Sequence, residues 1–270
     1  MGKTVKELRS ALTYALIAYL MFTLMLFLFQ RSMLYYPGDF KPTPEMLAEQ
    51  NLRDWPSSEN YRGFSSAREP TDVQGTIIVF HGNAGTAYHR GFYIDALSRH
   101  NLRVVLAEYP GYGGRDGKPD ESTLVSDGVE TLRLAHQAYG EPLYLWGESL
   151  GSGVAASVVA QAEVPVKGVV LYLPWDSLPK LAQTHYWYLP ARWLVLDQYN
   201  SVENLRGFDG NLAVVLAEKD EVVPAKHGRK LYESIETRKK LWVFDGARHN
   251  LVPTFAELHW WKEVCDFISQ

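Results

Sequence analysis

Six short apolar runs constrain the fold of this chain more than any other feature of its sequence. They are rich in β-branched and aromatic residues, and helix-length stretches separate most of them. The runs are GTIIVFHG (75–82), RVVLAEYPG (103–111), PLYLWGES (142–149), GVVLYLPW (168–175), NLAVVLAEKD (211–220) and KKLWVFDGARH (239–249). Strands that are apolar on both faces are typical of a parallel sheet covered by helices on both sides. The sequence therefore predicts an α/β fold with a mostly parallel sheet.

One connection between these runs is longer than a crossover requires. The fourth and fifth runs are separated by 35 residues, whereas about a dozen residues suffice for a crossover. The surplus includes the aromatic stretch THYWYLPARWLVLDQY, which predicts a small helical cap inserted at about 176–205. Ligands of such sheets bind outside the carboxyl ends of the strands. We therefore expect Tyr186, Trp187 and Trp193 to line a substrate pocket under the cap.

The stretch from Ser10 to Gln30 carries no formal charge and is apolar on every face. A helix of this length rises about 30 Å, which is the thickness of the hydrocarbon core of a bilayer. A cleaved signal peptide would have a shorter apolar stretch that ends in small residues. We therefore predict one retained transmembrane anchor over residues 10–30, after a short basic segment at 1–9. A cleaved signal and a buried soluble helix are the alternatives.

The charges around this anchor predict its orientation. Lys3, Lys6 and Arg9 precede it, and positive charge before a membrane span favours a cytoplasmic N-terminus. Beyond the span, Arg31 and Lys41 are partly offset by a nearby acid, so the bias is modest. We expect the rest of the chain on the non-cytoplasmic side, in the periplasm of a bacterium or the lumen of a eukaryotic organelle.

The segment LYLWGESLGSGVA places Ser149 between two glycines where a strand pattern gives way to a helix pattern. Gly147 and Gly151 permit a tight turn and a close approach of the backbone that side chains would prevent. The spacing Gly-x-Ser-x-Gly is typical of a nucleophilic serine on such a turn, although the motif is short. We predict that Ser149 is a nucleophile.

A nucleophilic serine needs a base within hydrogen-bond reach and a third group that orients the base. His249 follows the last apolar run, and Asp220 ends the run before it. The chain order Ser149, Asp220, His249 is the order of a triad in α/β-hydrolases. Asp176 also ends a run and is the alternative acid.

The loop HGNAGT after the first run is expected to stabilise the oxyanion. This requires backbone N–H groups directed at the position where negative charge develops. Leu150 is one expected donor, since it begins a helix and the helix dipole favours an anion there. Asn83 is the other, with Ala84 as the alternative. Gly82 and Gly85 would let this loop approach the substrate.

Three further side chains are expected near the same pocket. His81 follows the first run beside the HGNAGT loop, and Tyr109 and Tyr112 belong to the turn YPGYGGRDGKP. This turn is similar to a phosphate-binding loop, but Tyr112 stands where the first glycine is needed and Pro119 replaces the Ser or Thr after the lysine. It therefore predicts a rigid turn that leaves a strand.

Four motifs in this order, FHGNAG, YPGYGGRDGKP, LYLWGESLGSGVA and AEKDEVVP, carry a resemblance to a known family. Over about residues 70–255 the chain resembles the single-pass, membrane-anchored α/β-hydrolase-domain proteins, which include eukaryotic protein depalmitoylases and uncharacterised bacterial members. The resemblance implies an α/β-hydrolase fold and a serine hydrolase with a carboxylic ester, thioester or lipid substrate. We assign residues 31–60 to a linker and entry segment and residues 61–270 to the catalytic domain.

The remaining features limit other functions. A net charge of −4 gives no basic surface for nucleic acid. The chain has one cysteine and lacks a His-Glu-x-x-His pattern, so we expect no metal and no other cofactor. The stretch GSGVAA (151–156) fits a dinucleotide-binding fingerprint, but four residues separate it from the strand that should directly precede it. A nicotinamide-dependent oxidoreductase, a serine peptidase and an inactive hydrolase-fold binding protein are the alternatives.

Overall fold

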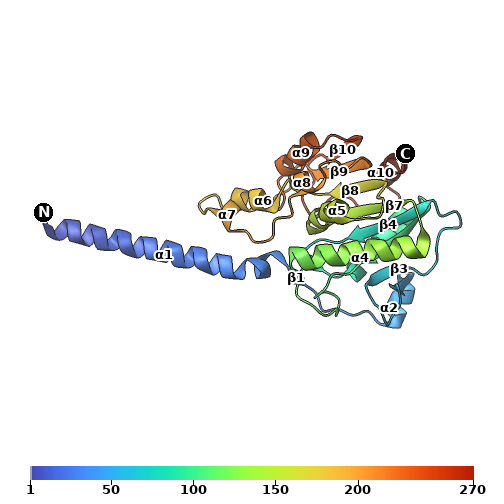
Figure 1. The fold of residues 1–270 in the computed structure, drawn as a ribbon, viewed down its shortest axis with the longest axis horizontal. Coiled ribbons are helices and arrows are strands. Elements are labelled where there is room, and N and C mark those ends of the chain that lie inside the picture. Colours follow the sequence, from blue (N-terminus) through green and yellow to red (C-terminus); the bar gives the residue numbers. More distant parts are fainter. Residues whose placement is uncertain (1) are drawn as a thin grey trace.

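The computed structural model describes residues 2–270 of the 270-residue chain. Its first helix, α1 (Gly2–Leu34), extends away from a single α/β domain (Figure 1). By length and composition, the stretch Thr4–Leu34 could cross a membrane, and its most apolar window has a mean hydropathy of 2.2. The helix includes the predicted anchor at residues 10–30 and continues beyond it at both ends.

The domain is built on one eight-stranded sheet with the strand order β10-β9-β8-β7-β4-β6-β3-β2. The six strands from β10 to β6 are parallel, and β3 and β2 are added antiparallel at one edge. The strands are β2 (Leu52–Trp55), β3 (Gly63–Ser66), β4 (Gly75–Phe80), β6 (Leu102–Ala107), β7 (Leu143–Glu148), β8 (Gly168–Tyr172), β9 (Asn211–Ala217) and β10 (Lys239–Phe244). The mostly parallel sheet predicted from the six apolar runs is confirmed.

Helices cover both faces of this sheet, which explains why its central strands are apolar on both sides. Successive side chains of a strand point to opposite faces. In β4, Ile78 and Phe80 pack against the layer of α4 and α5, whereas Ile77 and Val79 pack against the layer of α3 and α10. The covering helices are α4 (Glu121–Tyr139), α5 (Leu150–Gln161) and α9 (Ala225–Ser234) on one face, and α3 (Phe92–Ser98) and α10 (His259–Ser269) on the other.

The segment expected to be a linker, residues 31–60, contributes to the domain itself. It contains a short helix, α2 (Pro44–Glu49), and the edge strand β2, so the sheet begins before the expected boundary at residue 61. In β2 the side chains of Leu52 and Trp55 are buried, and those of Arg53 and Asp54 are not. A four-residue edge strand with only two buried side chains is too short to produce a clear sequence pattern, so no strand before residue 61 was evident from the sequence.

The insertion between β8 and β9 forms the expected small helical cap. It contains α6 (Leu178–His185), α7 (Ala191–Leu194) and α8 (Ser201–Asn204). In Figure 1, α6 and α7 project from the carboxyl ends of the strands and lie beside the last part of α1. The cap and the last part of the long N-terminal helix therefore lie next to each other at the carboxyl ends of the strands.

Candidate active site

Ser149 occupies a sharp turn between the end of β7 and the start of α5. Its backbone has φ +51° and ψ −111°, which is rare for a residue other than glycine and persists only where the surrounding structure requires it. A Cβ at Gly151 would lie 2.0 Å from the carbonyl oxygen of Phe80, and one at Gly147 would lie 2.3 Å from that of Gly151. Both glycines are therefore required by the close packing of α5 on the sheet. This strand–turn–helix context is the one in which the Gly-x-Ser-x-Gly motif exposes a nucleophile.

The structure brings His249 and Asp220 to this serine. The His249 Nε2 atom lies 3.1 Å from Ser149 Oγ, and its Nδ1 atom lies 2.6 Å from Asp220 Oδ2. The other carboxylate oxygen of Asp220 accepts the backbone N–H groups of Val222 at 2.8 Å and Val223 at 2.7 Å. Because a carboxylate only accepts hydrogen bonds, the ring carries its proton on Nδ1, and Nε2 is left to accept from the serine hydroxyl. This arrangement can deprotonate Ser149 as the hydroxyl attacks an electrophile.

The two residues whose backbone N–H groups are expected to bind an oxyanion line the same cavity as Ser149. Leu150 is the first residue of α5, so its N–H lacks a partner within the helix. Asn83 lies in the loop after β4, and its side chain donates a 2.9 Å hydrogen bond to the carbonyl oxygen of Leu34. Its own carbonyl oxygen accepts the backbone N–H of Tyr36 at 3.0 Å. The loop that carries Asn83 is thus held directly by the end of α1.

The glycines of this loop are needed for its packing against the protein. A Cβ at Gly82 would lie 2.9 Å from the carboxylate of Glu148, and Gly85 has φ +86° in the short pairing of β5 (Ala84–Gly85) with β1 (Tyr36–Pro37). Neither glycine lines the cavity itself, but Asn83 between them does. The expectation that these glycines let the loop approach the substrate stays a prediction.

His81, Tyr109 and Tyr112 also lie outside the cavity, contrary to expectation. All three are fully buried under the loop rather than beside the substrate space. His81 Nδ1 is 2.7 Å from the Gly82 carbonyl oxygen, and Nε2 is 3.0 Å from a carboxylate oxygen of Glu108. The Tyr109 hydroxyl donates to the His81 carbonyl oxygen at 2.7 Å, and burial raises the pKa of Tyr109, which keeps this donor protonated. These side chains are buried beneath the loop and hold its backbone by hydrogen bonds.

Asp176, the alternative acid, contacts a different histidine. Its Oδ1 atom lies 2.7 Å from His227 Nδ1, and its Oδ2 atom lies 3.2 Å from the Lys180 ammonium. Burial opposes ionisation of Asp176, but the hydrogen bonds from His227 and Lys180 outweigh it and lower its pKa. His227 Nε2 is 2.9 Å from the hydroxyl of Thr184 in α6. This second Asp–His–hydroxyl chain joins the cap to α9. The sequence gives no signal for it, because neither His227 nor Thr184 adjoins a strand end.

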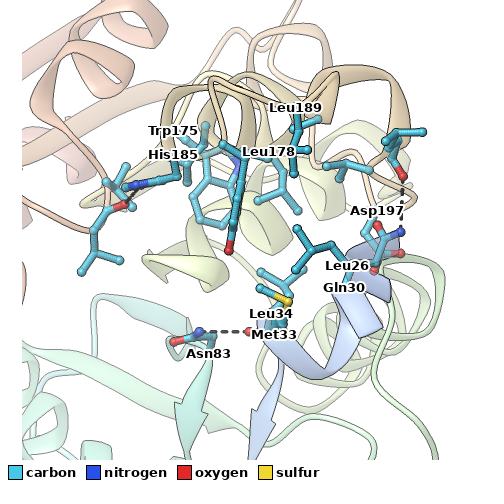
Figure 2. Close-up of a pocket in the computed structure, with 18 of the residues that line it drawn as sticks. Leu26, Gln30, Met33, Leu34, Asn83, Trp175, Leu178, His185, Leu189 and Asp197 are labelled. Carbon is cyan, nitrogen blue, oxygen red and sulfur yellow. Dashed lines mark hydrogen bonds between the residues drawn. The ribbon is translucent and has the colours of Figure 1, made fainter. Parts of the chain in front are cut away.

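A cavity of about 480 Å³ opens beside Ser149 between the cap and α1. Figure 2 shows Leu178 and Leu189 of the cap on one side, Leu26, Gln30 and Met33 of α1 on another, and Asn83 at the base. The lining is largely apolar, as is usual for a pocket that holds a small molecule.

Of the three aromatic residues expected in this pocket, only Tyr186 lines it. Trp187 and Trp193 are 79% and 74% exposed, so their assignment to the pocket is corrected. Trp187 follows Tyr186, the C-cap of α6, and Trp193 belongs to α7, whose residues Ala191 and Leu194 line the cavity instead.

The α1 side of the cavity was not foreseen either. A weak signal existed, since Thr23 and Gln30 are polar, lie seven residues apart in the apolar stretch and therefore share one helix face. Within residues 2–270, no group of three His, Cys, Asp or Glu side chains is placed to hold a metal ion.

Comparisons with known proteins agree with this architecture. The family model of the α/β hydrolase fold matches residues 75–195. An uncharacterised protein of Mycobacterium tuberculosis is 34% identical over 177 residues, which cover 64% of this chain and 62% of the relative. Lysophosphatidylserine lipase ABHD12 of Danio rerio is 32% identical over 201 residues, which cover 67% of this chain and 52% of the relative. The chain thus matches only part of the length of each relative.

Solved structures show the same fold at lower identity. An esterase of Pyrococcus furiosus, Pf2001, superposes with a TM-score of 0.63 at 17% identity and covers 86% of this chain and 97% of that one. A monoacylglycerol lipase of Paleococcus ferrophilus superposes with a TM-score of 0.56 at 19% identity, with coverage of 74% and 96%.

Proposed function

Because this chain is an α/β-hydrolase-fold protein, we propose that it is a membrane-anchored serine hydrolase that cleaves carboxylic esters or thioesters of acyl or lipid-like substrates. One observation carries the proposal. Ser149, on a turn of the kind that exposes a nucleophile, lies 3.1 Å from His249, which lies 2.6 Å from Asp220. A catalytically inactive fold would not need this chain of three hydrogen-bonding groups ending at a serine that lines an apolar cavity. The Danio rerio relative is named lysophosphatidylserine lipase ABHD12, and this name also supports a lipid ester as the substrate.

In the proposed mechanism, Ser149 Oγ attacks the carbonyl carbon while His249 Nε2 accepts the hydroxyl proton. The N–H groups of Leu150 and Asn83 donate to the oxyanion of the tetrahedral intermediate. His249 then gives its proton to the leaving alcohol or thiol, and an acyl-enzyme remains on Ser149. Water repeats both steps, which releases the acid and restores the serine. Asp220 holds the proton of the ring on Nδ1 and stabilises the imidazolium that forms in each half of the reaction.

Labelling with a fluorophosphonate probe, followed by a panel of esters of graded acyl length, tests this function. We expect covalent labelling of the full chain and a kcat/KM that rises from acetyl to medium-chain esters. Each additional buried CH₂ contributes up to about 0.8 kcal/mol, or about fourfold, until the cavity is full. If correctly folded protein showed no labelling and no ester hydrolysis, the proposal would be wrong.

The cavity walls should determine the length profile. Leu178 lines the cavity, and Leu178→Trp should move the optimum to shorter esters because the indole occupies acyl space. The matched control is Leu196→Trp, since Leu196 belongs to the same cap, is about half exposed and lies outside the lining. Undiminished fluorophosphonate labelling of Leu178→Trp shows that the triad is intact. An identical profile in both variants would contradict the placement of the acyl chain under the cap.

The proposed orientation places the catalytic domain on the non-cytoplasmic side. The basic residues before α1 favour a cytoplasmic N-terminus. We therefore expect protease to cut the domain in intact bacterial spheroplasts, and to spare it in sealed microsomes until the membrane is broken. A domain that is protected in spheroplasts, or cut in sealed microsomes, would show the opposite orientation.

A further inference from the structure

The last turns of α1 form one wall of the cavity beside Ser149. Their lining side chains are partly shielded, whereas the helix from residue 4 to residue 22 is exposed at every position. The shielded lining residues are Thr23, Leu26, Phe27, Gln30 and Leu34. Their spacing of three, one, three and four residues places them on a single face of the helix. A helix apolar enough to span a membrane is therefore also part of the substrate site.

Hydrogen bonds join this part of α1 to the cap along its length. The Tyr19 hydroxyl donates to the Tyr188 carbonyl oxygen at 3.2 Å, and the Gln30 amide oxygen accepts the Leu196 N–H at 2.8 Å. Tyr19 and Gln30 are about 16 Å apart along the helix axis. Since both lie in the charge-free stretch 10–30, the cap segment that they contact is level with the membrane-spanning part of α1.

Charged groups mark the end of this apolar zone. The Arg31 guanidinium pairs with Asp197 at 3.0 Å and with Asp120 at 3.2 Å, just beyond the point where the charge-free stretch ends. Ser149 follows β7, which pairs with β4, and Asn83 follows β4 and contacts Leu34, so Ser149 lies at the domain end of the cavity. From Leu34 back to Thr23 the α1 wall is about 16 Å long. An acyl chain in the cavity would run parallel to α1, with its carbonyl group at the charged boundary.

The outer surface of the cap also presents large apolar side chains. The segment Tyr186–Leu196, YWYLPARWLVL, carries one formal charge, on Arg192. Trp187 and Trp193 are almost fully exposed on it, and the Arg192 guanidinium lies 5.0 Å from the ring centroid of Trp193. Exposed tryptophans near a membrane span are typical of side chains that contact lipid, and an arginine can extend its charge to the interface.

We propose that the cap segment Tyr186–Leu196 lies in the domain-side leaflet beside α1, and that the cavity between them takes the acyl chain of a lipid directly from that leaflet. The inference rests on the proposed hydrolase function and specifies its substrate class as a membrane-resident acyl lipid. Such a lipid already holds its chain parallel to α1 and its ester at the hydrocarbon boundary. It reaches Ser149 by lateral movement, without crossing water.

The depth of the cap tests the proposal independently of activity. Cys265 is the only cysteine, so Cys265→Ala provides a background for Trp193→Cys, labelled with an environment-sensitive fluorophore in full-length protein. In phosphatidylcholine vesicles we expect a blue-shifted emission that is quenched by phosphatidylcholine carrying a doxyl group on its acyl chain. The matched control is Phe255→Cys, since Phe255 is an aromatic residue with 75% exposure whose carbonyl oxygen contacts Trp261 of α10. Its label should report water and escape quenching.

Turnover provides the second measurement. We expect Trp187→Ser together with Trp193→Ser to lower the ratio of hydrolysis of a vesicle-borne monoacyl lipid to hydrolysis of a soluble short-chain ester at least tenfold. Phe255→Ser should leave this ratio at the wild-type value.

Two results of the fluorescence experiment would overturn the proposal. The first is a label at residue 193 whose emission reports water. The second is a blue shift that depends on protein concentration and not on the quencher lipid, because a second copy of the chain would then cover the label. If the label at residue 193 were quenched but wild-type protein hydrolysed no ester, only the proposed function would be overturned.

Discussion

Ser149→Ala is expected to abolish fluorophosphonate labelling and to lower ester turnover by up to about 10⁶-fold, as when the nucleophile of a triad is removed. The substitution deletes one hydroxyl whose hydrogen-bond partner is His249 at 3.1 Å. Alanine imposes the same backbone constraint as serine at φ +51°, so the turn and its packing should remain. The melting temperature should therefore stay close to that of the wild-type protein.

The matched control is another buried serine of the same turn. Ser152 donates a 2.6 Å hydrogen bond from its hydroxyl to the Ser149 carbonyl oxygen, but its own hydroxyl does not face His249. Ser152→Ala should keep probe labelling and most of the turnover, while losing about 1 kcal/mol of stability with that hydrogen bond. If purified Ser149→Ala retained ester hydrolysis, the serine mechanism would be wrong.

Asp220→Asn is expected to lower turnover about 10⁴-fold, because it reverses the tautomer of His249. The backbone N–H groups of Val222 and Val223 both donate to Asp220 Oδ1. In the variant they would retain the amide oxygen at that position and direct the amide NH₂ group at His249 Nδ1. The ring would then carry its proton on Nε2, where it can no longer accept a proton from Ser149.

Asp176→Asn is the comparison variant, since it makes the same chemical change at the other buried aspartate. Asp176 contacts His227 and Lys180 rather than His249, so we expect its turnover to fall less than tenfold. Steady-state kinetics of the two variants on one soluble ester decide the assignment. A larger loss for Asp176→Asn than for Asp220→Asn would move the acid to the earlier strand.

Two Asp–His–hydroxyl chains in one fold explain why the acid could not be assigned with certainty from the sequence. Asp176 and Asp220 both follow parallel strands and both bond a histidine, at 2.7 and 2.6 Å. Only the folded arrangement distinguishes them, because His249 comes from the loop after β10, the neighbour of β9, whereas His227 lies in α9 and faces the cap.

The sequence by itself determined the parts of this protein that depend on local patterns. Strands buried on both faces need continuous apolar runs, and those runs predicted the parallel sheet. Gly147 and Gly151 are required by contacts within a few residues of Ser149 and with the neighbouring strand, so the turn was also evident from the sequence. A candidate membrane-spanning helix was also evident, because a charge-free stretch of 21 residues is long enough to cross a bilayer.

Only the tertiary structure decided which side chains face the cavity and what forms its walls. Tyr186 points inward and Trp187 outward on an irregular turn, where no periodic pattern relates sequence position to direction. The α1 wall depends on contacts such as Gln30 with Leu196, which are 166 residues apart in the chain. A uniformly apolar helix presents similar chemistry on every side, so its own sequence does not specify which face meets the cap. That choice is made by distant partners, and it joins the apolar helix α1 to the cavity beside Ser149.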